Sequence, residues 1–454
     1  MKVVSLNPAT ESVNKEFETA PKQEALRAAR QSKSGFKLWS KLDIKERAVY
    51  LKKLAGVLRS HKDEYAKLMT TEMGKPIKEA LAEVEKCAWT AEFYADNAER
   101  FLEKELVQTE NRKSYVTFEP LGAVLAIMPW NFPFWQALRF GIPSLAAGNV
   151  VLLRHSNVVP QCALAIEAAF TEAGFPEHVF TTLITDHGTV KTLIRSDYVN
   201  GVALTGSNAA GAAVAQLAGK YMKKAVFELG GSDPFIVLDD ADIAKAAEHA
   251  AKARTINAGQ SCIAAKRFIV MHTVADEFAR LFAERMQQLK VGDPLDPATD
   301  IGPLARSEQR AQLEAQVADA VQKGATVVCG GKRIEGKGYF YEPTVLTGTK
   351  PSMRVVKEEV FGPVAPVIVV KNEDQALKVA NDSEFGLGAS IWTRNAEKGE
   401  RMARFIEAGF VSVNQIVKSD PRLPFGGIKK SGVGRELSHY GLKEFVNIKT
   451  VVAG

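Results

Sequence analysis

The stretch from Asn257 to Cys262 places a thiol at the end of an expected helix, with a strand-like run from Lys266 to Met271 directly after it. A cysteine attacks carbon as its thiolate, so a catalytic role requires partial exposure and positively polarised surroundings. Backbone N–H groups of an irregular loop that contains Gly259 can supply this polarisation. The alternative is an inert, small apolar residue in the core. The choice depends on whether other parts of the chain bring partners to Cys262.

The other three cysteines lack reactive surroundings in the sequence. Cys87 and Cys162 fall in helical patterns beside alanines, and Cys329 ends a short apolar run. With no C-x-x-C pair and no clustered histidines, the pattern predicts neither a zinc site nor a disulfide framework, and a reducing cytosol fits best. Ala264 stands two residues after Cys262, which excludes a disulfide with a neighbouring thiol at that position.

Size, composition and the N-terminal sequence indicate a soluble globular protein, which we expect in the cytoplasm. A chain of 454 residues predicts two or three domains, and 46% hydrophobic with 25% charged residues is typical of globular proteins. A net charge of +6 without dense basic runs does not indicate nucleic-acid binding, although anionic small molecules remain compatible with it. Residues 1–17 lack the apolar segment of a secretory signal. The most apolar region, residues 121–153, is interrupted by three prolines and is not expected to span a membrane.

The order of elements predicts an α/β protein. Helical spacing of apolar residues occurs first, over residues 23–33, 43–61, 62–71 and 77–101. Apolar strands then alternate with helices, with strands expected at residues 124–127, 150–153, 179–184, 201–204 and 225–229. This alternation predicts a parallel sheet with ligands beyond the carboxyl ends of its strands, and a dinucleotide is the obvious candidate.

A second α/β region begins after Gly230, where we place the domain boundary. It is expected to contain a strand at residues 235–238, a helix at 243–257, a strand at 268–271 and a helix at 274–290. Residues 114–119 are expected to form a strand of a small hairpin. The β-rich tail at residues 444–452 could be an edge strand that pairs with another subunit.

One turn in the first region has the character of a phosphate site. The strand that ends at Leu204 runs into Gly206, Ser207 and an expected helix, whose first N–H groups can face a phosphate. The two glycines, Gly206 and Gly211, are five residues apart and do not match the Rossmann fingerprint. By itself the turn could equally be a helix cap.

Four short motifs accompany the cysteine. They are residues 129–133 (PWNFP), 227–231 (FELGG), 259–262 (GQSC) and 358–363 (EEVFGP). In this order and spacing they resemble the aldehyde dehydrogenase superfamily, and the resemblance covers nearly the whole chain. Residues 412–414 (SVN) and 424–427 (PFGG) resemble that family's C-terminal motifs.

The resemblance implies roles for three catalytic residues. Cys262 would attack an aldehyde carbonyl, and the Asn131 amide with the Cys262 N–H would stabilise the resulting oxyanion. After hydride transfer to a nicotinamide, Glu228 would activate the water that hydrolyses the thioester. Its apolar neighbours suit a carboxylate with a raised pKa. The structural alternatives are a strand-end carboxylate for Glu228 and a helix N-cap for Asn131.

The resemblance also implies cofactor contacts. Glu359 would bind the nicotinamide ribose, Trp130 and Ser207 would contact the pyrophosphate, and Gly206 and Phe361 would line the site. The family commonly has Lys at the position of Arg154 and Glu at that of Asn157, where the Glu repels a 2′-phosphate. Here Asn157 removes the repulsion, Arg154 offers a planar donor fork and Ser156 adds a hydroxyl. We therefore expect NADP to be preferred over NAD.

The substrate is expected to carry a carboxylate. If a helix runs from Asn131, then Trp135 and Arg139 share its face and the arginine can reach toward the amide. A salt bridge is the structural alternative for Arg139. Residues 135–140 and 418–424 resemble the short bacterial succinate-semialdehyde dehydrogenases, in which the residues matching Arg139 and Ser419 are associated with the substrate carboxylate. Trp135 would then form the apolar wall for the methylene chain.

Together these observations predict an NAD(P)-dependent oxidoreductase that converts succinate semialdehyde to succinate. The expected fold is that of the aldehyde dehydrogenases: a Rossmann-like cofactor domain (residues 1–100 and 119–230), an α/β catalytic domain (231–435) and a small β oligomerisation arm (101–118 and 436–454). We expect a homodimer or homotetramer that binds neither a metal nor nucleic acid and does not associate with a membrane. The alternatives are a dehydrogenase for glutarate semialdehyde or an aromatic aldehyde, and a non-catalytic superfamily member.

Overall fold

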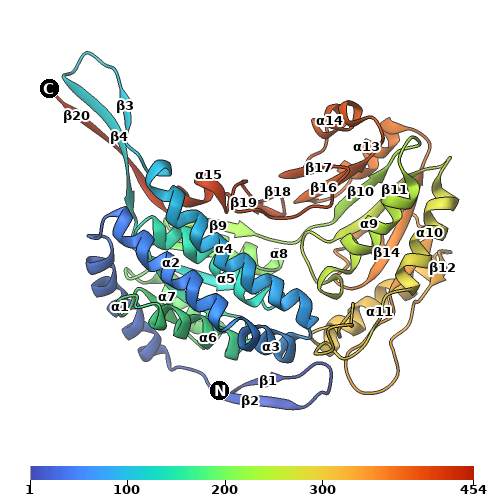
Figure 1. Cartoon of the computed structure of the whole chain (residues 1–454), viewed down its shortest axis with the longest axis horizontal. Helices are drawn as coiled ribbons and strands as arrows, with labels where there is room; N and C mark the ends of the chain where they lie inside the picture. Colours follow the sequence, from blue (N-terminus) through green and yellow to red (C-terminus); the bar gives the residue numbers. More distant parts are fainter. Residues whose placement is uncertain (1) are drawn as a thin grey trace.

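The computed structural model describes residues 2–454, which form two α/β bodies side by side with a long β-ribbon projecting from one of them (Figure 1). The first body is built on a six-stranded sheet with the order β19-β9-β8-β5-β6-β7. Its strands are β5 (Ala123–Met128), β6 (Val150–His155), β7 (Phe180–Thr182), β8 (Gly201–Thr205), β9 (Lys224–Glu228) and β19 (Gly432–Val433). All neighbours are parallel except β19, which runs antiparallel to β9.

The order of these strands creates a switch point between β5 and β8. From β5 the chain continues to β6 and β7 on one side, and it then returns to β8 and β9 on the other side. In open parallel sheets, ligands bind in the crevice beyond the carboxyl ends of the strands at such a point. Trp130 and Asn131 follow β5, and Gly206 and Ser207 follow β8.

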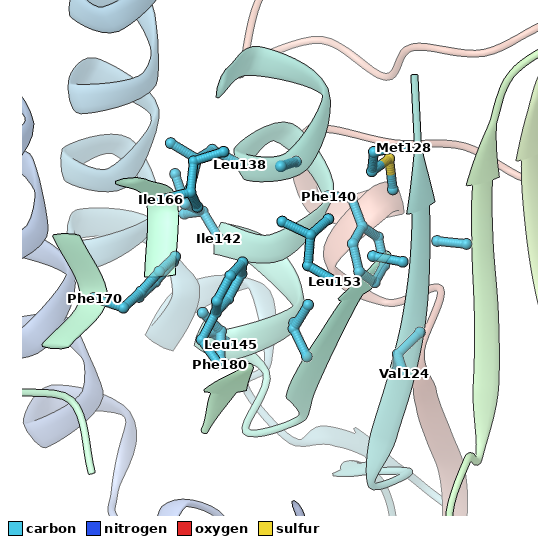
Figure 2. Close-up of a cluster of buried hydrophobic side chains, with 14 of the residues drawn as sticks. Val124, Met128, Leu138, Phe140, Ile142, Leu145, Leu153, Ile166, Phe170 and Phe180 are labelled. Atoms are coloured by element: carbon cyan, nitrogen blue, oxygen red, sulfur yellow. The ribbon is translucent and has the colours of Figure 1, made fainter. Parts of the chain in front are cut away.

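Helices surround this sheet. They are α1 (Lys22–Trp39), α2 (Ile44–Ser60), α3 (Lys62–Met73), α4 (Ile77–Phe101), α5 (Pro133–Ala146), α6 (Pro160–Glu172), α7 (His187–Arg195) and α8 (Asn208–Lys220). Every residue of α5 is buried. Figure 2 shows Leu138, Ile142 and Leu145 of this helix among side chains from β5, β6, α6 and β7. Because such cores are close-packed, α5 has a fixed position relative to the sheet and to the residues at its N-terminus.

The second body contains a seven-stranded sheet with the order β12-β13-β14-β11-β10-β16-β17. Its strands are β10 (Asp233–Val237), β11 (Ala265–Met271), β12 (Thr326–Cys329), β13 (Thr344–Thr347), β14 (Val364–Val370), β16 (Gly388–Trp392) and β17 (Phe410–Val413). Only β12 is antiparallel to its neighbour. Its helices are α9 (Ile243–Thr255), α10 (Ala275–Gln287), α11 (Ser307–Gln322), α12 (Arg354–Lys357), α13 (Glu373–Asn381) and α14 (Ala396–Ala403).

Side chains of this second sheet alternate between two apolar clusters. Phe235 and Phe268 belong to the cluster that includes α9 and α10, whereas Ile236 and Ile269 belong to the cluster that includes α13 and α14. Strands buried on both faces in this way have nearly continuous apolar sequences.

The projecting ribbon is a three-stranded sheet with the order β20-β4-β3 (Figure 1). It joins β3 (Glu105–Val107) and β4 (Lys113–Pro120) to β20 (Val446–Ala453), which is antiparallel to β4. The remaining elements are the β1 (Lys2–Leu6) and β2 (Val13–Glu18) hairpin, the small pair β15 (Phe385–Gly386) and β18 (Ile428–Lys429), and α15 (Ser438–Leu442). Within residues 2–454, no helix has both the length and the apolarity needed to cross a membrane.

The expected α/β class with parallel sheets is confirmed, and each strand expected between residues 124 and 271 is present within three residues of its bounds, the largest difference being β11, which begins at Ala265. The helix expected over residues 243–257 was two residues too long, because α9 ends at Thr255 and Asn257 takes a left-handed conformation. The division into three domains stays a prediction. The short strand β19, from the part assigned to the catalytic domain, pairs with the first sheet.

Candidate active site

The cysteine loop is an irregular connection between α9 and β11. A short 3-10 turn over Ile256–Gly259 follows the helix, and within it Asn257 and Ala258 take φ values of 52° and 54°. Left-handed backbone at residues with side chains persists only where surrounding contacts hold it. A Cβ on Gly259 would lie 2.3 Å from the carbonyl oxygen of Gly362. Glycine at this position therefore lets the cysteine loop pack against the 358–363 motif.

Lys266 holds the loop from within. This side chain is fully buried on β11, and its Nζ donates to the carbonyl oxygens of Ser261 at 2.8 Å, Cys262 at 2.7 Å and Ala264 at 3.2 Å. Hydrogen bonds from a charged donor are stronger than neutral ones. The ammonium group thus fixes the path of the backbone on both sides of the thiol.

An amide network connects the loop to the 129–133 motif. The Asn131 Nδ2 donates to the Gln260 carbonyl oxygen at 3.1 Å, and the Asn257 Nδ2 donates to the Asn131 carbonyl oxygen at 2.7 Å. Asn257 also donates to Gln260, at 3.1 Å. An amide nitrogen carries two hydrogens, so Asn131 retains a second donor beyond its bond to Gln260. Within residues 2–454, no acceptor takes the Cys262 N–H, which is therefore also free to bind a substrate oxygen.

The electrostatic surroundings of Cys262 act in opposite directions. The residue is partly exposed, but burial of its sulfur raises the pKa of the thiol to about 12, while the positive charges of Arg139 and Lys266 act to lower it. In this arrangement burial opposes the formation of the thiolate, and the two cations favour it. The other cysteines are more enclosed: burial raises the pKa of Cys87 and Cys162 well above the usual range.

Glu228 ends β9 beside the cysteine loop. The backbone of Gly231 lies so close to this loop that a Cβ there would be 2.5 Å from the Cys262 carbonyl oxygen. The Glu228 carboxyl is buried, and neither of its oxygens has a hydrogen-bond partner within residues 2–454. Burial and the nearby Glu436 carboxylate raise its pKa well above the usual value, whereas Arg139 acts to lower it. A raised pKa is what a general base near neutral pH requires.

Arg139 lies inside the protein, paired with an acid. Its guanidinium forms a buried ion pair with Glu436 and lies 4.8 Å above the Phe425 ring. A longer contact, at 3.4 Å, joins its Nη2 to the Thr205 hydroxyl. A salt bridge is therefore present, with Glu436 as the partner, but it is buried and not at the surface, and Arg139 also lies close enough to Cys262 to influence its pKa. Its contact with substrate stays a prediction.

The other two predicted substrate residues share a partner that the sequence did not indicate. Ser419 and Trp135 are both buried. The Lys86 Nζ donates to the Ser419 Oγ at 2.7 Å and lies 4.0 Å from the centre of the Trp135 ring. Within residues 2–454, no hydrogen bond joins Arg139 to Ser419.

Two acids on the same helix as Lys86 position the catalytic loops. Glu83 accepts from the N–H groups of Phe134 at 3.0 Å and Trp135 at 2.9 Å, so it caps α5, and it pairs with the fully buried Lys75. Glu79 accepts from the Asn257 N–H at 2.8 Å. A single stripe of α4 therefore contacts the cysteine loop, the start of α5 and the Ser419 region.

The helix expected to begin at Asn131 begins instead at Pro133, with Phe132 before it. The expected shared helical face is therefore wrong for Asn131, which lies in the loop before the helix, whereas Trp135 and Arg139 lie within it. Asn131 does not cap α5. Proline cannot donate a backbone hydrogen bond and favours the first position of a helix, and this signal in the sequence would have placed the start correctly.

The residues predicted to bind the pyrophosphate lie at the switch point. Ser207 caps α8 by accepting from the Ala210 N–H at 3.3 Å, and Gly206 precedes it. Helix α8 has 13 residues and begins directly after β8, so its first N–H groups are available to an anion. Trp130 meets Phe361 edge-on, with ring centres 5.8 Å apart, which brings the first and last motifs together.

Glu359, predicted to bind the nicotinamide ribose, contacts residues of two other motifs. Its Oε1 accepts from the Gly231 N–H at 3.1 Å and lies 3.6 Å from the Lys266 Nζ, and its side chain is 24% exposed. The Oε2 has no role in either contact and remains able to accept from ribose hydroxyls. These residues fit a dinucleotide in their donor and acceptor types.

The residues at the end of β6 differ in accessibility. Arg154 is buried and donates to the Thr185 carbonyl oxygen at 3.3 and 3.4 Å and to the Asn157 Oδ1 at 3.3 Å. Asn157 is exposed and Ser156 is partly exposed. These long hydrogen bonds hold the Arg154 guanidinium weakly, and no carboxylate occupies the position of Asn157. The chemistry of this region therefore suits a 2′-phosphate.

No group of His, Cys, Asp and Glu residues in the described chain is arranged to hold a metal.

Comparisons with known proteins identify the family. The model of the aldehyde dehydrogenase family matches residues 1–451, and the chain belongs to that family. A Synechocystis protein named as a probable NADP(+) succinate-semialdehyde dehydrogenase is 48% identical over 451 residues, with 99% of each chain covered. A Mycobacterium bovis protein named succinate-semialdehyde dehydrogenase [NADP(+)] 1 is 45% identical over 454 residues, again with 99% of each chain covered.

Solved structures have the same fold. The crystal structure of succinic semialdehyde dehydrogenase from Streptococcus pyogenes, in complex with NADP+, superposes with a TM-score of 0.97 at 38% identity and 99% coverage of both chains. The expected resemblance and fold are therefore confirmed. The individual site residues stay predictions, supported by the contacts described above.

Proposed function

We propose that this protein oxidises succinate semialdehyde to succinate with NADP as the electron acceptor. The observation that carries the proposal is that the Asn131 amide contacts the cysteine loop and Glu228 lies near Cys262, at the carboxyl ends of strands in one parallel sheet. The names of the relatives, at 45–48% identity over the full length, support the substrate and the cofactor.

In the first step, the partly exposed Cys262 thiol gives its proton to solvent water, and its sulfur forms a bond with the aldehyde carbon while the carbonyl electron pair moves to the oxygen. The Asn131 amide and the Cys262 N–H bind the oxyanion of the resulting tetrahedral thiohemiacetal. The oxidised nicotinamide, when bound, supplies the acceptor for the hydride that leaves this carbon. Loss of the hydride leaves a thioester on Cys262.

Glu228 acts in the second step. Its buried carboxylate removes a proton from water, which adds to the thioester carbon, and the Cys262 thiolate leaves as the acid forms. The raised pKa of Glu228 makes it a stronger base than an ordinary carboxylate. Arg139 would stabilise negative charge in this region, since it lies near both Glu228 and Cys262.

The remainder of the site would hold the substrate and cofactor. Trp135 would line the methylene chain, with Arg139 and Ser419 on the side of the distal carboxylate. Glu359 would bind the nicotinamide ribose, the N-terminus of α8 the pyrophosphate, and the Arg154 region the 2′-phosphate.

We also propose that the protein works in the cytoplasm as a homodimer or homotetramer. The sheet β20-β4-β3, which projects from the body (Figure 1), supports self-association. Leu106 and Ile448 on this sheet are 75% and 61% exposed. Apolar side chains on an exposed ribbon are suited to contact with another subunit.

Steady-state kinetics of the purified protein test the proposed function. We expect kcat/KM to be much higher for succinate semialdehyde than for butanal, which has the same chain length without the carboxylate. Titrations should show tighter binding of NADP than of NAD. Equal kcat/KM values for the two aldehydes would refute the substrate, and tighter binding of NAD would refute the cofactor.

A further inference from the structure

Lys86 is a cation in the proposed substrate region that has no carboxylate partner. The ammonium group donates to the neutral Ser419 hydroxyl at 2.7 Å and lies 4.0 Å from the centre of the Trp135 ring. The side chain is partly exposed, whereas both of its neighbours are buried. Within residues 2–454, no Asp or Glu lies at ion-pair distance from it. An enclosed charge without a counterion is costly, so this site favours an anion.

The charges around Lys86 explain why the protein does not neutralise it. Glu83 stands one helical turn earlier on α4, but this carboxylate already pairs with Lys75 and accepts two N–H groups of α5. Asp420 forms a two-bond pair with Arg422. The nearby acids are therefore engaged with other groups.

The other cations near Lys86 increase the demand for an anion. Burial is the largest cause that lowers the pKa of Lys86, to about 7, and the charges of Arg139 and Lys418 act in the same direction. Arg139 has its own partner in Glu436. Lys418 is exposed to solvent, so Lys86 is the more enclosed of the two cations without an acid partner in residues 2–454, which distinguishes it from the arginine expected from the sequence.

We infer that Lys86, together with the Ser419 hydroxyl, binds the distal carboxylate of the aldehyde substrate. Ser419 accepts its hydrogen bond from Lys86 and keeps its own O–H to donate, so the two groups can bind the two oxygens of one carboxylate. The Trp135 ring, which contacts the ammonium group, would also border the methylene chain. This role rests on the proposed function, because it concerns the same substrate, and it makes Lys86 a determinant of specificity.

The test compares two aldehydes in three variants. Lys86→Met keeps most of the side-chain length without the charge, and Lys86→Arg keeps the charge. Lys52→Met is the matched control, because Lys52 is 59% exposed on α2 and pairs with Asp96 at the surface. The kcat and KM for succinate semialdehyde and for butanal are measured with saturating NADP, and thermal unfolding verifies the fold of each variant.

Loss of a charged hydrogen bond predicts that Lys86→Met lowers the preference for succinate semialdehyde over butanal about 10- to 100-fold, chiefly through KM. Lys86→Arg should recover much of that preference, and Lys52→Met should keep it. Equal losses for both aldehydes, or an unchanged preference in Lys86→Met, would overturn the inference. If Lys86→Met does not fold, Lys86→Gln, which can still donate to Ser419, provides the same comparison.

The same data separate this inference from the proposed function. If the wild-type protein does not prefer succinate semialdehyde, the proposed function fails. If the wild type shows the preference and Lys86→Met retains it, only the role of Lys86 fails. Competition by succinate, measured as an inhibition constant, gives an equilibrium readout: it should weaken in Lys86→Met by a factor similar to the rise in KM.

Discussion

Replacement of Lys266 by Met should loosen the cysteine loop while leaving most of the protein intact. In the wild type, the buried ammonium group donates to three carbonyl oxygens of this loop and lies 3.6 Å from Glu359. Methionine has nearly the same length but cannot donate, so the three buried acceptors lose that partner. Removal of one member of a buried charged network typically costs about 3–5 kcal/mol, and the cost is not additive over the bonds.

The expected change in melting temperature follows from the size of the chain. An unfolding entropy of about 2.1 cal/mol/K per residue gives roughly 0.95 kcal/mol/K for a chain of this length. A cost of 3–5 kcal/mol therefore lowers Tm by about 3–5 °C if the chain unfolds as one unit. Lys266 also acts to lower the pKa of Cys262, so the variant should lose reactivity at the thiol as well.

Two assays examine this prediction. Calorimetry gives Tm, and hydrogen exchange of the loop amides, residues 257–264, shows whether the change is local. Lys52→Met, with the same change of charge at the surface, is the control. A Tm within about 1 °C of the wild type, together with unchanged exchange in the loop, would refute the structural role given to Lys266.

Two further predictions concern the cofactor and pH. Asn157→Glu places a carboxylate where a 2′-phosphate is expected. In fluorescence titrations, Kd for NADP should therefore rise about 10-fold or more while Kd for NAD does not. Equal changes in the two Kd values would contradict the NADP preference. Glu79→Gln keeps an acceptor for the Asn257 N–H but removes an acid whose pKa burial raises from 4.5 to about 7. Between pH 4.5 and about 7 the folded state holds a proton that the unfolded state has lost, so the stability of the wild type falls as pH rises. The Tm of the variant should fall less across this window. An identical dependence of Tm on pH in both proteins would exclude a contribution from Glu79.

The class of fold and the family could be predicted from the sequence because both depend on local patterns. Strands of the parallel sheets are buried on both faces, so runs such as Val150 to Leu153 are distinctive. The motifs around Cys262 and Glu228 have short, fixed spacings. Their coincidence in one chain carried more information than any of them did alone.

The contacts between distant segments could not be predicted in the same way. Lys86 and Ser419 are 333 positions apart, and nothing near either residue indicates the other. Glu83 appeared as one more acid on an amphipathic helix, although it caps α5 across the interior. The left-handed turn at Asn257 is likewise held by tertiary contacts rather than by local preference.

The partner of Arg139 also depends on the tertiary fold. The sequence placed a cation near the thiol but did not indicate that Glu436, almost 300 positions later, would pair with it. As a result, the arginine expected to bind substrate has its own counterion, whereas Lys86 has no acid at ion-pair distance within residues 2–454. Which cation in a buried site lacks a counterion can be seen only when all the charged side chains around it are placed.

The central claim is that Cys262 forms the covalent bond to the substrate, and trapping the thioester tests it most directly. In Glu228→Gln, mixed with succinate semialdehyde and NADP and then quenched in acid, hydrolysis should be slow and the thioester should accumulate. Peptide mass spectrometry is expected to find a succinyl group on the peptide that contains Cys262 and none on Cys87, Cys162 or Cys329. Absence of the adduct from Cys262 while one equivalent of NADPH forms, or turnover by Cys262→Ala, would contradict the mechanism.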